Sequence, residues 1–114
     1  MKILIVEDNA AMRHLLRSIV GEMAEVFECN DGSEALPLYE AHRPDWVLMD
    51  LKMKEVDGLQ ATRMLTSLHP EARVVIVTNY NNERMRARAR AAGACDYVLK
   101  EDLSVLGPML SAPP

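Results

Sequence analysis

The chain has 114 residues, with 17 acidic and 13 basic side chains and a formal net charge of −4. Apolar residues make up 49% of the sequence and charged residues 26%, which is typical of a globular domain and argues against disorder. The length predicts one domain over 1–114, with a core large enough to fold without a metal or a disulfide. Because no apolar run approaches the roughly 20 residues that cross a bilayer, and the start is unlike a signal peptide, we expect a cytoplasmic protein without membrane association.

Five short apolar segments alternate with longer segments of helical periodicity. The apolar segments are Ile3–Val6, Glu25–Cys29, Trp46–Met49, Val74–Val77 and Tyr97–Leu99. Most are rich in Val, Ile and Leu without strict alternation, which is typical of strands buried on both faces of a parallel sheet. The repeated alternation of strand and helix predicts an α/β fold with right-handed crossovers and helices on both faces.

Four helices are predicted between these strands from apolar stripes and capping residues. Their approximate ranges are 12–23, 31–42, 61–68 and 82–92. Asn9 is placed to cap the first helix, and Asp31 begins a capping box for the second. Pro37 lies inside the second helix, so we expect either a later start or a kink there.

A fifth helix is predicted to be short. Only Asp102–Leu106 has helical character before Gly107-Pro108, where we expect the helix to end and a tail over 107–114 to begin. Such a helix would leave part of the sheet uncovered. We therefore expect self-association, as a homodimer, through the face formed by the fourth and fifth helices.

Polar residues stand at the ends of four predicted strands. Glu7 and Asp8 follow the first strand, Asp50 follows the third, and Thr78 and Lys100 end the fourth and fifth. Because the carboxyl ends of parallel strands meet at one edge of a sheet, these side chains should converge. Three carboxylates so close would repel each other unless a cation lies among them, and Mg²⁺ (or Mn²⁺) prefers such oxygen ligands. One carboxylate could then attack a phosphoryl group, while the hydroxyl and the ammonium hold its oxygens.

Each of these residues also has a structural explanation. Glu7 and Asp8 could simply favour the positive end of the first helix, and Lys100 could be a solvated charge. Asp50 is harder to explain in this way, because an acid closing an apolar strand is costly unless it is paired or functional. The joint placement of the residues at one edge favours a functional site over the separate explanations.

Four motifs, in this order, resemble the receiver domain of bacterial two-component response regulators. They are ILIVEDN over 3–9, VLMDLKM over 47–53 with Asp57-Gly58 beyond, VVIVT over 74–78 and GACDYVLK over 93–100. The resemblance covers residues 2 to about 106, and HPEARVVIVT and YVLKED are most similar to the NarL/FixJ-like subgroup. It implies a flavodoxin-like (CheY-like), doubly wound five-stranded parallel sheet of order 2-1-3-4-5.

The resemblance also implies a phosphorylation switch. Asp50 would be the phosphoacceptor and would take its phosphoryl group from a sensor histidine kinase or a phosphotransfer protein. Asp8 and Asp50 would bind Mg²⁺ directly, the backbone carbonyl of Lys52 would be a third ligand, and Glu7 would act through water. The only expected catalysis is self-phosphorylation and slow autodephosphorylation, so the domain is not expected to be an enzyme.

Three further residues would carry the signal outward. Thr78 would move toward the phosphoryl group, Lys100 would bind it, and Tyr97 would turn inward. These movements would reshape the surface of the fourth helix, fifth strand and fifth helix, which controls a downstream output domain or protein.

The predicted fourth helix carries four arginines around a narrow apolar seam. The arginines are Arg84, Arg86, Arg88 and Arg90, and the seam consists of Met85, Ala89 and Ala92. We expect Arg84, Arg88 and Tyr97 to belong to a partner surface. Direct nucleic-acid binding is disfavoured because the chain as a whole is acidic.

The sequence departs from the family pattern near the predicted site. Lys52 places a positive side chain close to the expected metal, and Lys54 and Glu101 stand where many receivers have proline. Asn79 is bulkier than the Ala or Ser usual there, and we expect it to shield the phosphoryl group and slow its hydrolysis. Lys52, Asn79 and Tyr80 are the expected tuning residues.

Two other functions remain open at this point. One is a phosphate-independent, receiver-like interaction module, which Lys52 and Asn79 favour and which Mg²⁺ affinity would distinguish. The other is a phosphatase or hydrolase. Such an enzyme would need a second acid two residues after Asp50 as general acid or base, but Lys52 occupies that position. Relatives in the NarL/FixJ subgroup usually continue into a DNA-binding domain, so the chain is either a stand-alone receiver or a fragment of a longer regulator.

The two cysteines are not expected to pair. Cys29 and Cys95 belong to opposite edges of a sheet of order 2-1-3-4-5, roughly 19 Å apart at about 4.8 Å per strand step. That separation is far beyond the reach of a disulfide.

Overall fold

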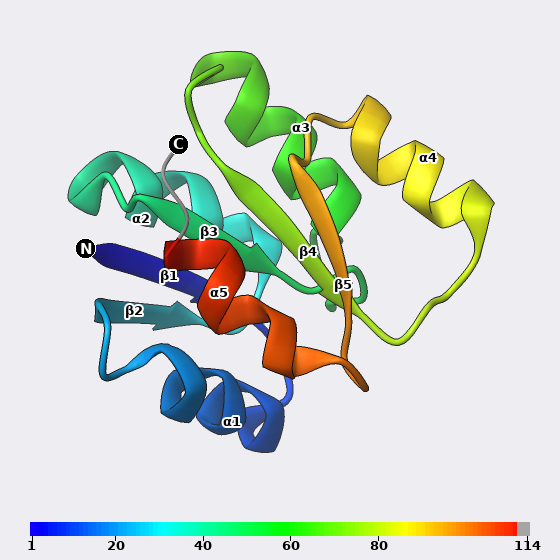
Figure 1. Cartoon of the computed structure of the whole chain (residues 1–114). Helices are drawn as coiled ribbons and strands as arrows, with labels where there is room; N and C mark the ends of the chain where they lie inside the picture. The colour runs from blue at the N-terminus through cyan, green and yellow to red at the C-terminus, as the bar shows by residue number, and fades with distance from the viewer. Residues whose placement is uncertain (112–114) are drawn as a thin grey trace.

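Five parallel strands form one sheet in a computed structural model that describes residues 1–111. The strands are β1 (Lys2–Val6), β2 (Glu25–Cys29), β3 (Trp46–Met49), β4 (Val74–Thr78) and β5 (Asp96–Leu99). Their order is β2-β1-β3-β4-β5, as predicted (Figure 1). The two cysteines are free and belong to opposite edges, Cys29 at the end of β2 and Cys95 just before β5.

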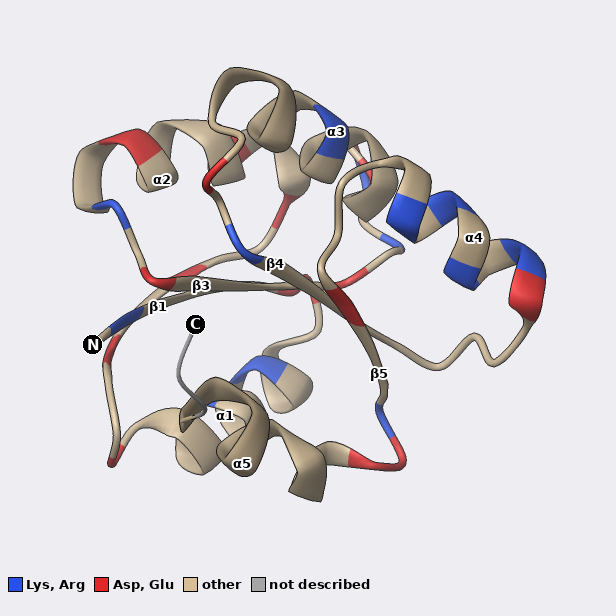
Figure 2. Ribbon diagram, turned by 45° about the horizontal axis from the view of Figure 1, so that its top comes forward, with Lys and Arg blue, Asp and Glu red and all other residues tan. Residues whose placement is uncertain are grey.

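Helices cover both faces of the sheet. One face carries α1 (Ala10–Val20) and α5 (Leu106–Ser111), and the other carries α2 (Ala35–His42), α3 (Gly58–Leu68) and α4 (Glu83–Ala91), as Figure 2 shows. Short 3₁₀ turns over Gly32–Glu34 and Leu103–Val105 precede α2 and α5. No helix among residues 1–111 is long and apolar enough to cross a membrane.

The strands bury alternate side chains in two separate cores. Along β3, Val47 and Met49 pack toward α2, α3 and α4, whereas Trp46 and Leu48 pack toward α1 and α5. Both sets are almost fully buried. Because each face of the sheet faces a core, both sets must be apolar, which explains why the strands lack a polar–apolar alternation.

The first helix begins where its capping residue predicts, whereas Asp31 caps the 3₁₀ turn Gly32–Glu34 and not α2. Asn9 caps α1, and its Oδ1 accepts a hydrogen bond from the backbone N–H of Met12 at 2.8 Å. The second helix begins late, at Ala35. Pro37 therefore lies in the first turn of α2, where a backbone N–H has no partner within the helix, and it introduces no break.

The fifth helix is short, as predicted, but its predicted range is wrong. Instead of ending at Gly107-Pro108, the chain forms α5 from Leu106 to Ser111, and the expected tail is helical up to that residue. Pro108 is the third residue of α5, so its missing N–H again falls in the first turn and breaks no helical hydrogen bond. Leu106 and Leu110 are buried in the core on this face. Residues 112–114 of the expected tail lie outside the described part of the chain, and self-association through the face of α4 and α5 stays a prediction.

The strand register brings the polar residues of the predicted site to one rim. Val6 pairs with Cys29 on one side and with Met49 on the other, so the residues after β1 and β3 are neighbours. The backbone N–H of Asp50 donates to the carbonyl of Val6 at 2.9 Å. Likewise, the N–H of Lys100 donates to the carbonyl of Thr78 at 2.8 Å. The carboxyl ends of β1, β3, β4 and β5 thus form one edge, as the sequence predicts.

Candidate functional site

The predicted site residues line one cavity at this edge. The cavity has a volume of about 360 Å³. Its lining residues come from the ends of four strands and the loops that follow them: Glu7, Asp8, Asn9, Asp50, Lys52, Thr78, Asn79, Tyr80 and Lys100. All the residues predicted to bind metal, hold the phosphoryl group or tune its lifetime lie here, except Tyr97.

Three carboxylates form the centre of the site. Glu7, Asp8 and Asp50 each place a carboxylate oxygen within 4.8 Å of the others. Glu7 is 1% exposed and Asp50 is 7% exposed, whereas Asp8 is open to solvent. The site is thus acidic, with two carboxylates on its buried floor and one at its mouth.

Lys100 connects the two buried acids. Its Nζ lies 2.9 Å from Glu7 Oε1 and 3.3 Å from Asp50 Oδ1. Burial alone would lower the pKa of the Lys100 ammonium, but Glu7 and Asp50 outweigh this effect and raise it. Lys100 is therefore charged near neutral pH and offsets one of the three negative charges.

The negative charge of the Glu7 carboxylate is only partly offset by the groups around it. Burial raises the pKa of its carboxyl group from 4.5 to about 7, and the neighbouring charge of Asp50 also raises it. Lys100 and the backbone N–H of Asn9 act in the opposite direction. Glu7 Oε1 is buried and is paired with Lys100 Nζ at 2.9 Å. An oxygen in this position can accept a further cation.

The donor set fits a hard divalent cation. Mg²⁺ and Mn²⁺ bind through carboxylate, carbonyl and water oxygens, and the three clustered carboxylates carry more negative charge than Lys100 balances. The specific observation in favour of such an ion is that three carboxylate oxygens lie within 4.8 Å of one another beside a single ammonium group.

Lys52 does not point its charge at the carboxylates. Its Nζ lies 5.2 Å from the centre of the Tyr80 ring, and a hydrogen bond to Tyr80 raises the pKa of Lys52. The loop after β3 therefore meets the loop after β4 across the cavity. Within residues 1–111, the ion pairs of Glu7 and Asp50 are made by Lys100 and not by Lys52.

Thr78 and Tyr97 are connected through the loop that follows β4. Thr78 is buried, and its Oγ1 accepts a hydrogen bond from the N–H of Tyr80 at 3.2 Å. The hydroxyl of Tyr97 donates to the carbonyl of Tyr80 at 2.6 Å. The guanidinium of Arg86 lies 4.6 Å above the Tyr97 ring. Tyr97 is half-buried beside α4 and lies outside the carboxylate cavity.

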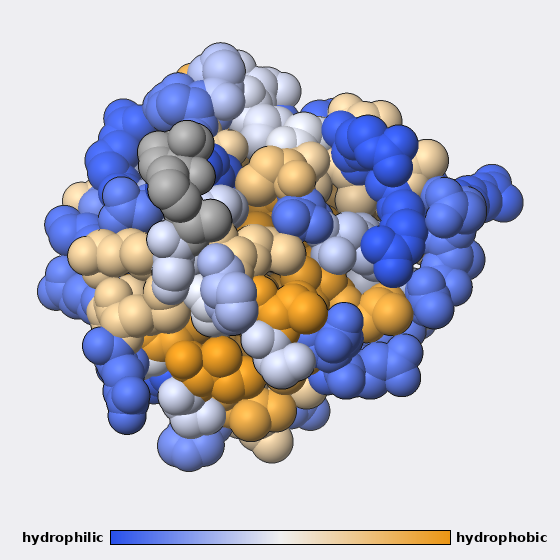
Figure 3. Space-filling view, in the orientation of Figure 1, coloured by the Kyte–Doolittle hydropathy of each residue, from blue (hydrophilic) through white to orange (hydrophobic). Residues whose placement is uncertain are grey.

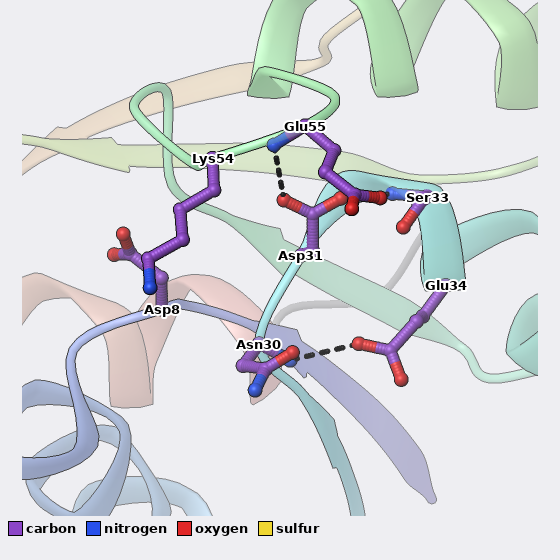
Figure 4. Close-up of a pocket in the computed structure, with 7 residues that line it drawn as sticks. All are labelled: Asp8, Asn30, Asp31, Ser33, Glu34, Lys54 and Glu55. Atoms are coloured by element: carbon purple, nitrogen blue, oxygen red, sulfur yellow. Dashed lines mark hydrogen bonds between the residues drawn. The ribbon is translucent and has the colours of Figure 1, made fainter.

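Asp31 has a role that its place in a capping box did not reveal. One carboxylate oxygen accepts from the N–H of Glu55 at 3.0 Å, and the other accepts from Ser33 at 2.9 Å and Val56 at 3.3 Å. These backbone hydrogen bonds lower the pKa of Asp31 to about 2. Figure 4 shows Asp31 beneath the loop that leads from Asp50 to α3. Asp31 therefore holds the far end of the loop that carries Lys52.

A second cavity adjoins the first at Asp8. It has a volume of about 370 Å³ and lies between the loops after β1, β2 and β3. In Figure 4, Lys54 extends from the loop after β3 toward Asp8, on the side away from Asp31. Lys54, like Lys52, thus lies near the predicted metal site without entering the cluster of buried acids.

The four arginines of α4 do not share one surface. Arg86 contacts Tyr97 and, with Arg90, lines a groove beside β5. Arg84 and Arg88 are exposed, and they fall on the other side of the apolar seam because successive residues turn by 100°. Arg84 and Arg88 thus lie on the other side of the helix from Tyr97, and the partner surface expected from these three residues stays a prediction.

The comparison with known proteins agrees with this geometry. The sequence pattern of the response regulator receiver domain matches residues 3–107. The chain belongs to this family.

Several receiver proteins are similar along most of the chain. The chemotaxis protein CheY of Halobacterium salinarum is 35% identical over 100 residues, which make up 87% of this chain and 83% of that protein. The transcriptional regulatory protein PdtaR of Mycobacterium tuberculosis is 39% identical over 101 residues, 87% of this chain but 49% of that protein. The chain thus spans about half the length of the transcriptional regulators that it matches.

Solved structures show the same receiver fold. A two-component response regulator of the LuxR family from Aurantimonas superposes with a TM-score of 0.85 at 28% identity, covering 96% of this chain and 84% of that one. The relatives thus include both chemotaxis CheY proteins and a LuxR-family regulator, and they do not single out one subgroup. The family consists of signalling domains and not of catalytic enzymes. Glu7, Asp8 and Asp50 form an acidic triad of the type that binds Mg²⁺ in receiver domains.

Proposed function

We propose that this receiver domain is a phosphorylation-activated signalling switch whose phosphoacceptor is Asp50. The observation that carries the proposal is the placement of the buried Asp50 carboxylate in the acidic triad, 3.3 Å from Lys100 Nζ. The phosphoryl group comes from a sensor histidine kinase or a phosphotransfer protein. The proposed subgroup is NarL/FixJ-like and the proposed location is the bacterial cytoplasm, where two unpaired cysteines are in keeping with a reducing environment.

The proposed chemistry is one group transfer to a carboxylate. A carboxylate oxygen of Asp50 attacks the phosphorus, an O–P bond forms, and the N–P bond of the phosphohistidine breaks as the imidazole leaves. Asp8, Asp50 and the carbonyl of Lys52 would hold Mg²⁺ or Mn²⁺, with Glu7 acting through water. The bound ion would supply positive charge to the carboxylates and the phosphoryl oxygens.

Two of the chain's own groups would hold the transferred phosphoryl group. Lys100 can exchange part of its contact with Asp50 for a phosphoryl oxygen, because its Nζ already faces the acceptor. Thr78 now accepts a hydrogen bond from Tyr80, so its own hydroxyl hydrogen is free to be donated to a second phosphoryl oxygen.

The same contacts suggest how the state of Asp50 reaches the surface. Movement of Thr78 toward the phosphoryl group would break its hydrogen bond with Tyr80, whose carbonyl holds Tyr97. Tyr97 lies under Arg86 of α4, so the surface of α4, β5 and α5 would change with it. An output domain or protein that binds this surface would then distinguish the two states.

The position of Lys52 argues against the alternative of a phosphate-independent interaction module. That alternative requires Lys52 to obstruct the metal, whereas its ammonium lies 5.2 Å from the centre of the Tyr80 ring and, within residues 1–111, forms no ion pair with Glu7 or Asp50. The carboxylates of Glu7 and Asp50 instead form ion pairs with Lys100, and the proposed switch requires Lys100 at this position.

Reductive trapping tests the proposed acceptor. Borohydride reduces an acyl phosphate of aspartate to homoserine, so peptide mass spectrometry can locate the modified residue after treatment with a phosphodonor and Mg²⁺. We expect homoserine at position 50. Homoserine at Asp8 or Asp57 instead would contradict the assignment.

A further inference from the structure

Two arginines of α1 lie at one edge of the apolar stripe of that helix. Leu16 and Val20 of the stripe are buried in the core that α1 shares with α5, and Figure 3 shows apolar side chains gathered over these two helices. Because successive residues turn by 100°, Arg13 and Arg17 fall next to Val20 at the edge of the stripe. Both form ion pairs with Glu28 of β2. Their guanidinium groups thus extend from α1 toward the edge strand of the sheet.

Arg13 makes one contact that Arg17 does not. Its Nη1 donates a hydrogen bond to the backbone carbonyl of Glu7 at 2.8 Å, while its Nε lies 3.3 Å from Glu28 Oε1. Arg17 pairs with the other oxygen of Glu28. The side chain of Arg13 is 24% exposed and that of Arg17 is 50% exposed, so the contacts of Arg13 are better shielded from water. Arg13 therefore connects β2 with the loop that carries the acids.

The carbonyl that Arg13 binds belongs to the peptide unit that leads to Asp8. This peptide bond is trans and planar, so fixing the carbonyl of Glu7 also fixes the N–H and the Cα of Asp8. The N–H of Glu7 donates to the carbonyl of Cys29 at 3.1 Å, which holds the chain one peptide earlier. Among residues 1–111, no backbone N–H donates to the carbonyl of Glu7 itself. Its direction is thus set by the guanidinium of Arg13.

Asp8 depends on this restraint more than the other two acids do. Glu7 and Asp50 are buried and pair with Lys100. The carboxylate of Asp8 is exposed and forms no ion pair within residues 1–111, and no hydrogen bond joins it to its neighbours in Figure 4. Ordering a free side chain costs conformational entropy when it binds a ligand. A backbone already fixed at Asp8 reduces that cost.

We propose that Arg13 is a positioning residue, which places Asp8 for a divalent cation by holding the carbonyl of Glu7. This rests on the metal site of the proposed function. The charge of Arg13 acts in the opposite direction, because a guanidinium near three carboxylates repels a cation. Loss of Arg13 therefore tightens metal binding if its charge dominates, and weakens metal binding if it positions Asp8. The sign of the change separates the two effects.

Two variants of the same helix test this role. Arg13→Met and Arg17→Met each remove one positive charge and one ion pair with Glu28, but only the first removes the contact with Glu7. The probe is Mn²⁺, and its binding to the unphosphorylated domain is measured by the relaxation rate of water protons. We expect Arg13→Met to weaken Mn²⁺ binding about tenfold, a loss common when a group that orients a metal ligand is removed. We expect Arg17→Met to change it by less than about twofold.

Two results of the Mn²⁺ titration would overturn the proposal. Unchanged or tighter binding to Arg13→Met would mean that the charge of Arg13 outweighs any positioning of Asp8. Equal weakening in Arg13→Met and Arg17→Met would assign the effect to their shared ion pairs with Glu28 and not to the carbonyl of Glu7.

The rate of phosphorylation by acetyl phosphate gives a second readout. We expect Arg13→Met to raise the Mg²⁺ concentration at half-maximal rate about tenfold and to leave the rate at saturating Mg²⁺ within about twofold, because Asp50 and Lys100 are untouched. A damaged fold would lower the saturating rate as well, and that result would contradict a positioning role. If the wild type takes up no phosphate, the proposed switch fails, while the Mn²⁺ titration still tests Arg13.

A measurement on the wild type does not depend on the folding of any variant. Nitrogen-15 NMR resolves the guanidinium N–H signals of arginine side chains. We expect Mg²⁺ to shift the signals of Arg13, which contacts the loop of the site, and to leave those of Arg17 in place. Signals of Arg13 that do not respond to Mg²⁺ would contradict its connection to the metal site.

Discussion

Glu7 is the residue whose charge depends most on what the site holds. Its pKa of about 7 lies above its ordinary value of 4.5, because the carboxyl group is buried. Between pH 4.5 and 7 the folded metal-free domain thus holds a proton that the unfolded chain has lost, so this group makes stability fall as the pH rises through that window. Binding of a divalent cation next to Glu7 favours its ionised form and therefore releases this proton.

Mg²⁺ affinity is therefore predicted to depend on pH. We expect binding about tenfold weaker at pH 6 than at pH 8, with proton release, because affinity rises by up to one order of magnitude per pH unit below the pKa of Glu7. Isothermal calorimetry in two buffers of different ionisation enthalpy measures both quantities. Glu7→Gln, which cannot titrate, should abolish most of the pH dependence, and equal affinities in the wild type at both pH values would contradict this account.

Asn79 is predicted to set the lifetime of the phosphoryl group. It is exposed, follows Thr78 directly and lines the carboxylate cavity, so we expect its side chain to limit the approach of water. We expect Asn79→Ala to speed the loss of phosphate from Asp50 several-fold, measured as the decay of the phosphorylated mass with time. Asn81→Ala, on the same loop but outside the cavity, is the matched control. If Asn79→Ala leaves the decay rate unchanged, the shielding explanation fails.

Among the elements, the loop from Asp50 to α3 depends on Asp31. Asp31 accepts hydrogen bonds from Glu55 and Val56, and the glycine that follows it, Gly32, lies so close to Val56 that a Cβ would overlap its carbonyl oxygen. Removal of the carboxylate leaves these N–H groups without a partner, at a cost of about 1–3 kcal/mol. Because the loop carries the carbonyl of Lys52, the same change should disturb the proposed metal site.

We therefore predict that Asp31→Ala lowers both stability and Mg²⁺ affinity. Denaturant unfolding should show a loss of about 1–3 kcal/mol, and hydrogen exchange should be faster at the amides of Glu55 and Val56. Glu34→Ala, which removes only a 3.4 Å hydrogen bond to the N–H of Asn30, is the control. Unchanged exchange at Glu55 and Val56 would show that Asp31 does not hold the loop.

The elements that the sequence could predict are those whose pattern is local. The apolar runs located all five strands, and the order of polar residues after them placed Asp50 and Lys100 at one rim. The end of the fifth helix was placed too early because the effect of Pro108 depends on where the helix begins, which packing of Leu106 and Leu110 decides.

Contacts between distant segments could not be predicted from pattern. Asp31 and the loop that it binds are 24 residues apart, and neither end carries a signal for the other. The contact between Arg86 and Tyr97 joins a helix to an edge strand in the same way. In a helix with an arginine at every second position, only the packing against β5 shows which pair faces the groove.

At the scale of the whole molecule, the residues that stabilise the sheet are separate from the polar residues proposed to respond to phosphorylation. Two apolar cores hold the strands, so the polar residues at the carboxyl rim need not stabilise the fold and are free to respond to charge. A series of contacts leads from that rim through Thr78 and Tyr80 to Tyr97, beside the groove between α4 and β5. The account thus depends on one event, the transfer of a phosphoryl group to Asp50.

The most direct test is the intact mass of the domain after incubation with acetyl phosphate and Mg²⁺. The account predicts a single phosphoryl adduct in the wild type, and none with Asp50→Ala or with a chelator of the metal. Circular dichroism of each sample establishes that it is folded. The absence of an adduct on folded wild-type protein, or its persistence in Asp50→Ala, would contradict the account.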